Sequence, residues 1–207
     1  MDVKDGMMKN NNKVKFSENV ILLDAAFLNE VVAGVRTWME SELDRALPLL
    51  DLPGWLNLLA LDAGIRTDGN DIQVILVHDE ANRQLKCCEP SDLSALEGMA
   101  CRIPIGELSF SCVNPAGITD CGDLFVDLMS LALDSAEVKH LALVPYMRAY
   151  GDRVDELLRK YFDEKEEGEN LQVILFTLGQ PAAPVNYTWD FVSFSLAGAL
   201  GIKPEEL

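Results

Sequence analysis

Polar side chains follow directly on three apolar stretches whose composition is typical of buried strands. Asp24 follows Val-Ile-Leu-Leu, and His78 follows a second run of aliphatic residues. Tyr146 and Arg148 come just after the proline that ends a third run. In α/β proteins the carboxyl ends of parallel strands share one edge of the sheet, and ligands bind there. The sequence therefore predicts a ligand-binding site formed by Asp24, His78, Tyr146 and Arg148.

These side chains suit different kinds of chemistry. Arg148 is suited to clamp a carboxylate or a phosphate, because a guanidinium matches the geometry of both groups. The imidazole of His78, next to Asp79, is suited to act as a base or as a ligand. Asp24 also suits a purely structural role, which is to cap the helix that begins shortly after it. The residue types alone leave these roles open.

The composition narrows the classes of function. The chain has 207 residues, and its 34 acidic against 17 basic side chains give a net charge of −17. This charge repels phosphate backbones, so we expect no generic binding to nucleic acid. A protein partner or self-association into a homo-oligomer is compatible with it.

We expect a cytoplasmic protein without a membrane span. No apolar stretch reaches the roughly 18 residues that a span needs, and the polar first residues do not form a signal peptide. The five cysteines include no Cys-x-x-Cys pair, which favours reduced structural thiols. A glycine-rich turn after the first apolar stretch, a P-loop and a Gly-x-Ser-x-Gly elbow are also missing. The sequence thus gives no support to dinucleotide binding, P-loop phosphate binding or serine hydrolysis.

Helical and strand patterns alternate along the chain. Strands are expected at 20–23, 72–77, 107–113, 140–144 and 171–176, and the main helices at 27–47, 54–62, 120–133, 152–163 and 189–200. The polar and apolar residues of 107–113 alternate, which indicates a half-exposed strand near an edge. Pro104 and Gly106 favour a loop at 101–106. Trp38 and Trp55 are both expected in the core.

These elements predict a three-layer, Rossmann-like α/β sandwich with a mostly parallel central sheet of about five strands. Strands as apolar as these must be covered by helices on both faces. Residues 1–15 are expected to form a flexible lead-in, and residues 16–207 to form a single domain.

The order of elements resembles the PIN/NYN nuclease-like domain. Val20-Ile-Leu-Leu-Asp24 matches the family's first strand with its terminal aspartate, and Gly122-Asp-Leu-Phe-Val-Asp127 resembles its aspartate-bearing helix. The resemblance implies a PIN/NYN-like fold and a divalent-metal-dependent phosphodiesterase or nuclease. It also implies that Asp24, Asp123 and Asp127 hold Mg²⁺ or Mn²⁺, since one or two carboxylates with water and phosphate can bind Mg²⁺.

The chain departs from that family where the chemistry needs a further acid. In place of the family's Ser-Gly-Asp turn it has Pro145-Tyr-Met-Arg148, which contains no carboxylate. The acids of the helix at 120–133 also repeat as they would on the solvated side of an amphipathic helix. We therefore expect a non-catalytic or degenerate domain that binds a partner or a small ligand at the carboxyl edge of the sheet. The metal-dependent nuclease is the alternative.

The chain as a whole also resembles a bacterial family of proteins of unknown function. The resemblance is carried by Gly-Asp-Arg-Val-Asp-Glu-Leu-Leu, which begins at Gly151, and by Trp-Asp-Phe and Gly-Ile-Lys-Pro-Glu-Glu-Leu near the end. No biochemistry is attached to that family.

Overall fold

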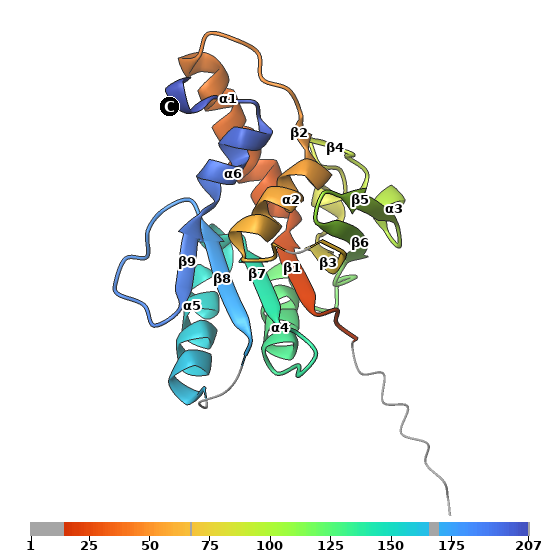
Figure 1. Ribbon diagram of the computed structural model, residues 1–207, viewed down its shortest axis with the longest axis vertical. Coiled ribbons are helices and arrows are strands. Elements are labelled where there is room, and N and C mark those ends of the chain that lie inside the picture. Colours follow the sequence, from red (N-terminus) through yellow and green to blue (C-terminus); the bar gives the residue numbers. More distant parts are fainter. Residues whose placement is uncertain (1–14, 67, 166–169, 207) are drawn as a thin grey trace, which may run out of the picture.

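A seven-stranded sheet forms the centre of the protein, in the order β5-β6-β3-β1-β7-β8-β9 (Figure 1). The computed structural model describes residues 15–66, 68–165 and 170–206, so nearly all of the predicted lead-in lies outside the described residues. Neighbouring strands run parallel, except for the antiparallel pair β5 and β6. The strands are β1 (Asn19–Asp24), β3 (Asn70–Val77), β5 (Ala100–Ile103), β6 (Gly106–Val113), β7 (His140–Val144), β8 (Gln172–Thr177) and β9 (Thr188–Phe191).

The mostly parallel α/β sheet is as predicted, but the predicted number of about five strands is wrong. β5 lies in the segment expected to be a loop, and β9 lies where the last helix was expected to begin. Pro104 lies in the tight turn between β5 and β6, and Gly106 is the first residue of β6. Both residues therefore mark a hairpin turn, which leaves the preceding residues free to form a strand.

β6 is half-exposed, as its alternating pattern predicted, and it is the strand next to the edge strand β5. It lies between β5 and β3. Leu108 and Phe110 are buried on one face, whereas Glu107 and Ser109 on the other face are exposed. The alternation thus reports that one face of β6 faces solvent, and it says nothing about the strand's place in the sheet.

The strand order identifies a switch point in the topology. From β1 the chain adds β3 and then β6 on one side, and it returns to the other side of β1 with β7, β8 and β9. Without β5, this is the strand order of doubly wound nucleotide-binding folds, in which ligands bind where the direction of winding reverses. Here that position is the crevice outside the carboxyl ends of β1 and β7.

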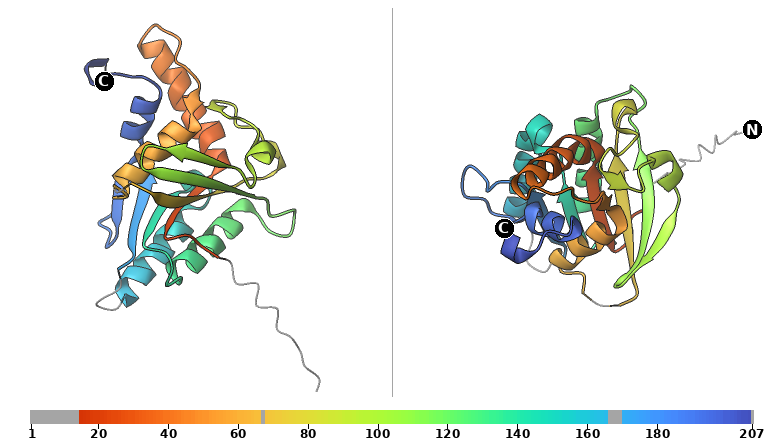
Figure 2. Two further views of the ribbon diagram at one scale, coloured as in Figure 1. Left: turned by 45° about the vertical axis from the view of Figure 1, so that its right-hand side comes forward. Right: turned by 90° about the horizontal axis from the view of Figure 1, so that it is seen from above.

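Helices cover the sheet on both faces (Figures 1 and 2). β1 is apolar throughout because both its faces are buried. Ile21 and Leu23 belong to the hydrophobic cluster on one face of the sheet, and Val20 and Leu22 belong to the cluster on the other face. The first face carries η1 (Phe27–Val32), α1 (Ala33–Glu42), α2 (Leu52–Asp62), α3 (Leu93–Leu96) and α6 (Val192–Ala199), and the second carries α4 (Cys121–Leu133) and α5 (Met147–Glu164). The smaller elements are β2 (Leu50–Asp51), β4 (Cys88–Glu89), η2 (Glu80–Asn82) and η3 (Pro204–Glu206). None of the described helices is long and apolar enough to cross a membrane.

Three predictions about helices and their tryptophans need correction. The single helix expected at 27–47 is a π-helical turn, η1, continued by α1 as far as Glu42. The helix expected from 152 begins earlier, at Met147. Trp38 is 60% exposed, against the expected core position, whereas Trp55 is fully buried as expected. In Figure 1, α1 extends beyond the sheet.

Candidate functional site

A crevice of about 280 Å³ lies at the switch point of the sheet. We call it the switch-point crevice, and it is formed after β1 and β3 and at the first turns of α4 and α5. Acidic side chains dominate its lining, which includes Asp24, Glu30, Asp79, Asp120, Cys121, Tyr146, Tyr150 and Arg153. Burial, together with the negative charge of Asp24, Asp79 and Asp120, raises the pKa of the Cys121 thiol to about 11. The crevice is therefore unfavourable for anions.

Asp24 is the buried group of this crevice, with only 1% of its surface exposed. One carboxylate oxygen accepts a hydrogen bond of 2.7 Å from the backbone N–H of Ala26, and the other accepts one of 2.6 Å from the Tyr150 hydroxyl. Burial raises the pKa of Asp24 in spite of these donors, and the nearby Asp79 adds to the rise. The expected capping role is thus fulfilled in part, because Asp24 binds the first turn that follows β1.

Tyr150 reaches Asp24 because α5 is kinked. Its backbone angles, φ −144° and ψ 22°, are not helical although it lies inside α5. The hydroxyl also accepts a hydrogen bond of 3.1 Å from the backbone N–H of Tyr146, the first residue before the helix. The side chain therefore joins the end of β1 to the start of α5, and its ring packs on Phe125 of α4 with 5.5 Å between ring centroids.

Asp120 and Asp123, at the start of α4, are occupied by structural contacts. Asp120 caps the helix by accepting a hydrogen bond from the backbone N–H of Asp123. The Asp123 carboxylate accepts from the Thr119 hydroxyl and is paired with Arg153 of α5, and both contacts lower its pKa. Asp127 is exposed one turn further along α4. Among the described residues, no group of three or more His, Cys, Asp or Glu side chains is arranged to hold a metal ion.

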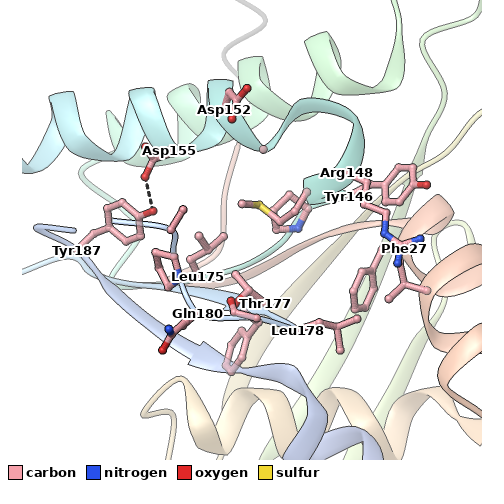
Figure 3. A pocket seen from close by; sticks show the side chains of 18 of the residues that line it. Phe27, Tyr146, Arg148, Asp152, Asp155, Leu175, Thr177, Leu178, Gln180 and Tyr187 are labelled. Carbon is pink, nitrogen blue, oxygen red and sulfur yellow. Dashed lines mark hydrogen bonds between the residues drawn. The ribbon is translucent and has the colours of Figure 1, made fainter. Parts of the chain in front are cut away.

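A larger cavity of about 430 Å³ lies beside the crevice, at the carboxyl ends of β7 and β8 (Figure 3). We call it the β8 cavity. Its walls are the first turns of η1 and α5, the end of β8, and the segment 178–187 that connects β8 to β9. Tyr146 lines both the crevice and the cavity. Other lining residues are Phe27, Arg148, Leu175, Thr177, Gln180 and Tyr187.

Polar contacts fasten the segment 178–187 to α5. The Tyr187 hydroxyl donates a hydrogen bond of 2.6 Å to Asp155, and Arg159 donates one of 3.0 Å to the backbone oxygen of Pro184. Asn186 donates to the backbone oxygen of Arg159 at 3.1 Å. Burial opposes ionisation of Asp155, yet the donors Arg159 and Tyr187 bring its pKa below the usual range. These links fix the outer wall of the cavity.

The comparison with protein families assigns the chain. The model of a family described as a family of unknown function (DUF6621) matches residues 13–207. The chain belongs to DUF6621. The expected membership of a family of unknown function is confirmed, and no evidence for a PIN/NYN relationship or for a bacterial source accompanies it. Searches of curated proteins and of solved structures found no match.

In this DUF6621 chain the structure divides the predicted ligand-binding residues between the two hollows. Asp24 and Tyr146 line the crevice, and Tyr146 and Arg148 line the cavity. His78 lines neither of them, since it is buried and its Nδ1 lies 3.0 Å from the backbone oxygen of Asp79. The predicted metal residues are also separated, because Asp24 lines the crevice while Asp123 and Asp127 do not.

The sequence did not point to two tyrosines that shape the site. Tyr150 lies just before the position where a helix was expected to begin, so it was not assigned to a helix. Tyr187 follows an irregular, proline-containing segment whose path cannot be read from its residue types. One signal was present for Tyr150, which is the Tyr-Gly pair at 150–151 inside a stretch of strong helical periodicity.

Proposed function

We propose that this DUF6621 chain is a non-catalytic binding domain for a small organic ligand, which occupies the β8 cavity. The observation that carries the proposal is the cavity itself, about 430 Å³ in volume at the carboxyl ends of β7 and β8. Small-molecule sites generally measure about 300–1,000 Å³ and combine apolar walls with a few polar groups. Ligands of doubly wound sheets bind at this edge.

The residues of the cavity offer both kinds of contact. Phe27, Val31 and Leu175 supply apolar surface, while Arg148 and Gln180 supply polar groups. The five cysteines are free thiols, as a reducing cytoplasm would keep them, and the proposal is for a cytoplasmic protein.

The alternative of metal-dependent phosphodiester cleavage requires carboxylates that are free to bind a cation. The Asp24 carboxylate is held by Tyr150 and Ala26, and the Asp123 carboxylate by Arg153 and Thr119. The described residues contain no group of three potential ligands. This donor set does not fit Mg²⁺ or Mn²⁺, so the nuclease alternative has no support from the geometry of the crevice.

The proposal is tested by ligand-observed NMR with a set of neutral, cationic and anionic fragments. Gly151 lines the cavity, and a Cβ atom there would lie 3.0 Å from Cε of Met147, another lining residue. Gly151→Leu therefore fills part of the cavity. The matched control is Gly198→Leu in α6, where a Cβ would lie 3.6 Å from Leu58, an ordinary contact.

We expect fragments to bind to the wild type and to the Gly198→Leu variant, and to lose binding in the Gly151→Leu variant. Circular dichroism establishes first that both variants are folded. Equal binding of every fragment to the folded Gly151→Leu variant contradicts the proposal, and so does the absence of binding by fragments of any charge.

A further inference from the structure

We infer that the ligand of the β8 cavity is an amphipathic anion, whose carboxylate or phosphate group binds Arg148 and whose apolar part fills the cavity. This inference rests on the proposed function and names the class of its ligand. It follows from the charges around the cavity, from the position of Arg148, and from a second hollow beside it.

Arg148 contributes a positive charge to the lining of the β8 cavity. Asp155, which also lines the cavity, is paired with Arg159 and accepts a hydrogen bond from Tyr187. Glu30, close to the mouth, accepts a hydrogen bond from the Tyr146 hydroxyl. Throughout the described residues, no carboxylate lies within ion-pair distance of the Arg148 guanidinium. Two cations line the cavity, Arg148 and Arg159, and only Arg148 is outside the ion pairs of the described residues, so it is the cation left for an anionic ligand. Asp152 also lines the cavity and is likewise outside these ion pairs.

The kink in α5 explains why Arg148 has no partner on its own helix. Asp152 is four residues further along, a spacing at which Arg and Asp normally pair on a helix surface. The non-helical backbone of Tyr150 lies between them and breaks this geometry. In Figure 3, Asp152 points away from the strands, whereas Arg148 lies beside Phe27.

A second hollow adjoins the β8 cavity at Arg148. It gives room for a ligand that extends beyond its charged group. This hollow, of about 310 Å³, is lined by Val35 and the exposed Trp38 of α1, and by one acid, Glu30. Val31, Arg148 and Leu178 line both this hollow and the β8 cavity. The cation therefore stands at the junction of two mainly apolar surfaces, as the recognition of an amphipathic molecule requires.

The surrounding fields favour the same position for an anionic group. The acids of the neighbouring switch-point crevice repel an anion. An anionic ligand at this edge of the sheet is thus directed to the cavity and away from the crevice.

The test compares octanoate, octyl phosphate and the neutral octanamide by titration into ¹⁵N-labelled protein. We expect at least one anion to bind in the cavity at least about tenfold more tightly than octanamide, since hydrogen bonds to charged groups are the stronger ones. Tighter binding of octanoate identifies a carboxylate ligand, and tighter binding of octyl phosphate a phosphate. Either result supports the inference.

Variants of Arg148 separate its charge from its shape. Arg148→Ala is expected to weaken the preferred anion about tenfold to a hundredfold and to leave octanamide unchanged. Arg148→Lys keeps the charge but loses the planar fork, so it should restore part of the affinity. The control is Arg102→Ala, which removes another exposed arginine, from β5 and outside the cavity.

Three results overturn the inference. The first is equal affinity for octanamide and both anions, the second is an unchanged anion affinity in the Arg148→Ala variant, and the third is that neither anion binds. The proposed function is then decided separately by the fragment measurement with Gly151→Leu, because that measurement includes neutral and cationic ligands.

Discussion

Replacing Tyr150 with phenylalanine tests how the site is held together. The change keeps the ring that packs on Phe125 and removes only the hydroxyl, which donates to Asp24 and accepts from the N–H of Tyr146. A hydrogen bond to a charged group contributes about 1.5–3 kcal/mol, and a neutral one about 0.5–1.5 kcal/mol. The loss should therefore be larger when Asp24 is ionised.

The pH dependence follows from the raised pKa of Asp24. Because its folded-state pKa lies above the unfolded value of 3.8, the native state holds a proton that the unfolded state has lost, and stability falls as pH rises through this window. Tyr150 is a donor that favours the ionised form. Its removal raises the pKa of Asp24 further, so the free energy of unfolding should decrease more steeply with pH in the Tyr150→Phe variant.

Urea unfolding followed by circular dichroism between pH 5 and pH 8 measures both effects. Tyr187→Phe is the matched control, because its hydroxyl also donates to a carboxylate, that of Asp155, at 2.6 Å. Asp155 is partly exposed, so water can replace the lost donor and the cost should be smaller. If the two variants lose equal stability at pH 8, or if the Tyr150→Phe loss does not grow with pH, the reasoning about Asp24 is wrong.

Three further predictions concern the switch-point crevice. Asp24→Asn should make the free energy of unfolding less dependent on pH above 3.8, since an amide cannot ionise; unchanged pH dependence in urea titrations would show that another group is responsible. Gly122→Ala should lower the free energy of unfolding by about 1–3 kcal/mol, because its Cβ would lie 2.3 Å from Nη2 of Arg153 and 2.8 Å from the Tyr150 ring. Gly198→Ala is the control and should leave the free energy of unfolding unchanged in the same assay. Addition of about 10 mM Mg²⁺ or Mn²⁺ should change the melting temperature by less than about 1 °C, because the described residues form no metal site and only a cation that binds the native state raises this temperature. A larger rise that Asp24→Asn abolishes would restore the metal hypothesis.

The central strands could be predicted because both their faces are buried. β7 has the predicted bounds, and β1 and β3 differ from prediction by at most two residues at either end. β9 could not be recognised, since its four residues run directly into α6 and their pairing with β8 depends on a distant segment. The local pattern of apolar residues indicates which strands are buried, but it does not indicate which strands are neighbours in the sheet.

The candidate site was predictable only to the extent that topology determines it. Asp24, Tyr146 and Arg148 could be assigned to one edge because residues at the carboxyl ends of parallel strands meet there. The division of this edge into an acidic crevice and a cavity could not be foreseen. It depends on the kink at Tyr150 and on the path of 178–187, and both are set by contacts between distant residues.

The connection between β8 and β9 has a consequence for how the cavity can vary. Parallel strands are usually joined by a helix that must pack on the sheet, so its residues are constrained by the core. Here the irregular segment 178–187 makes the connection, and most of its residues are exposed. Substitutions at Gln180 or Ala183 therefore reshape one wall of the cavity without repacking the interior. Under the proposed function, substitutions in this segment would change which ligand binds while the scaffold stays the same.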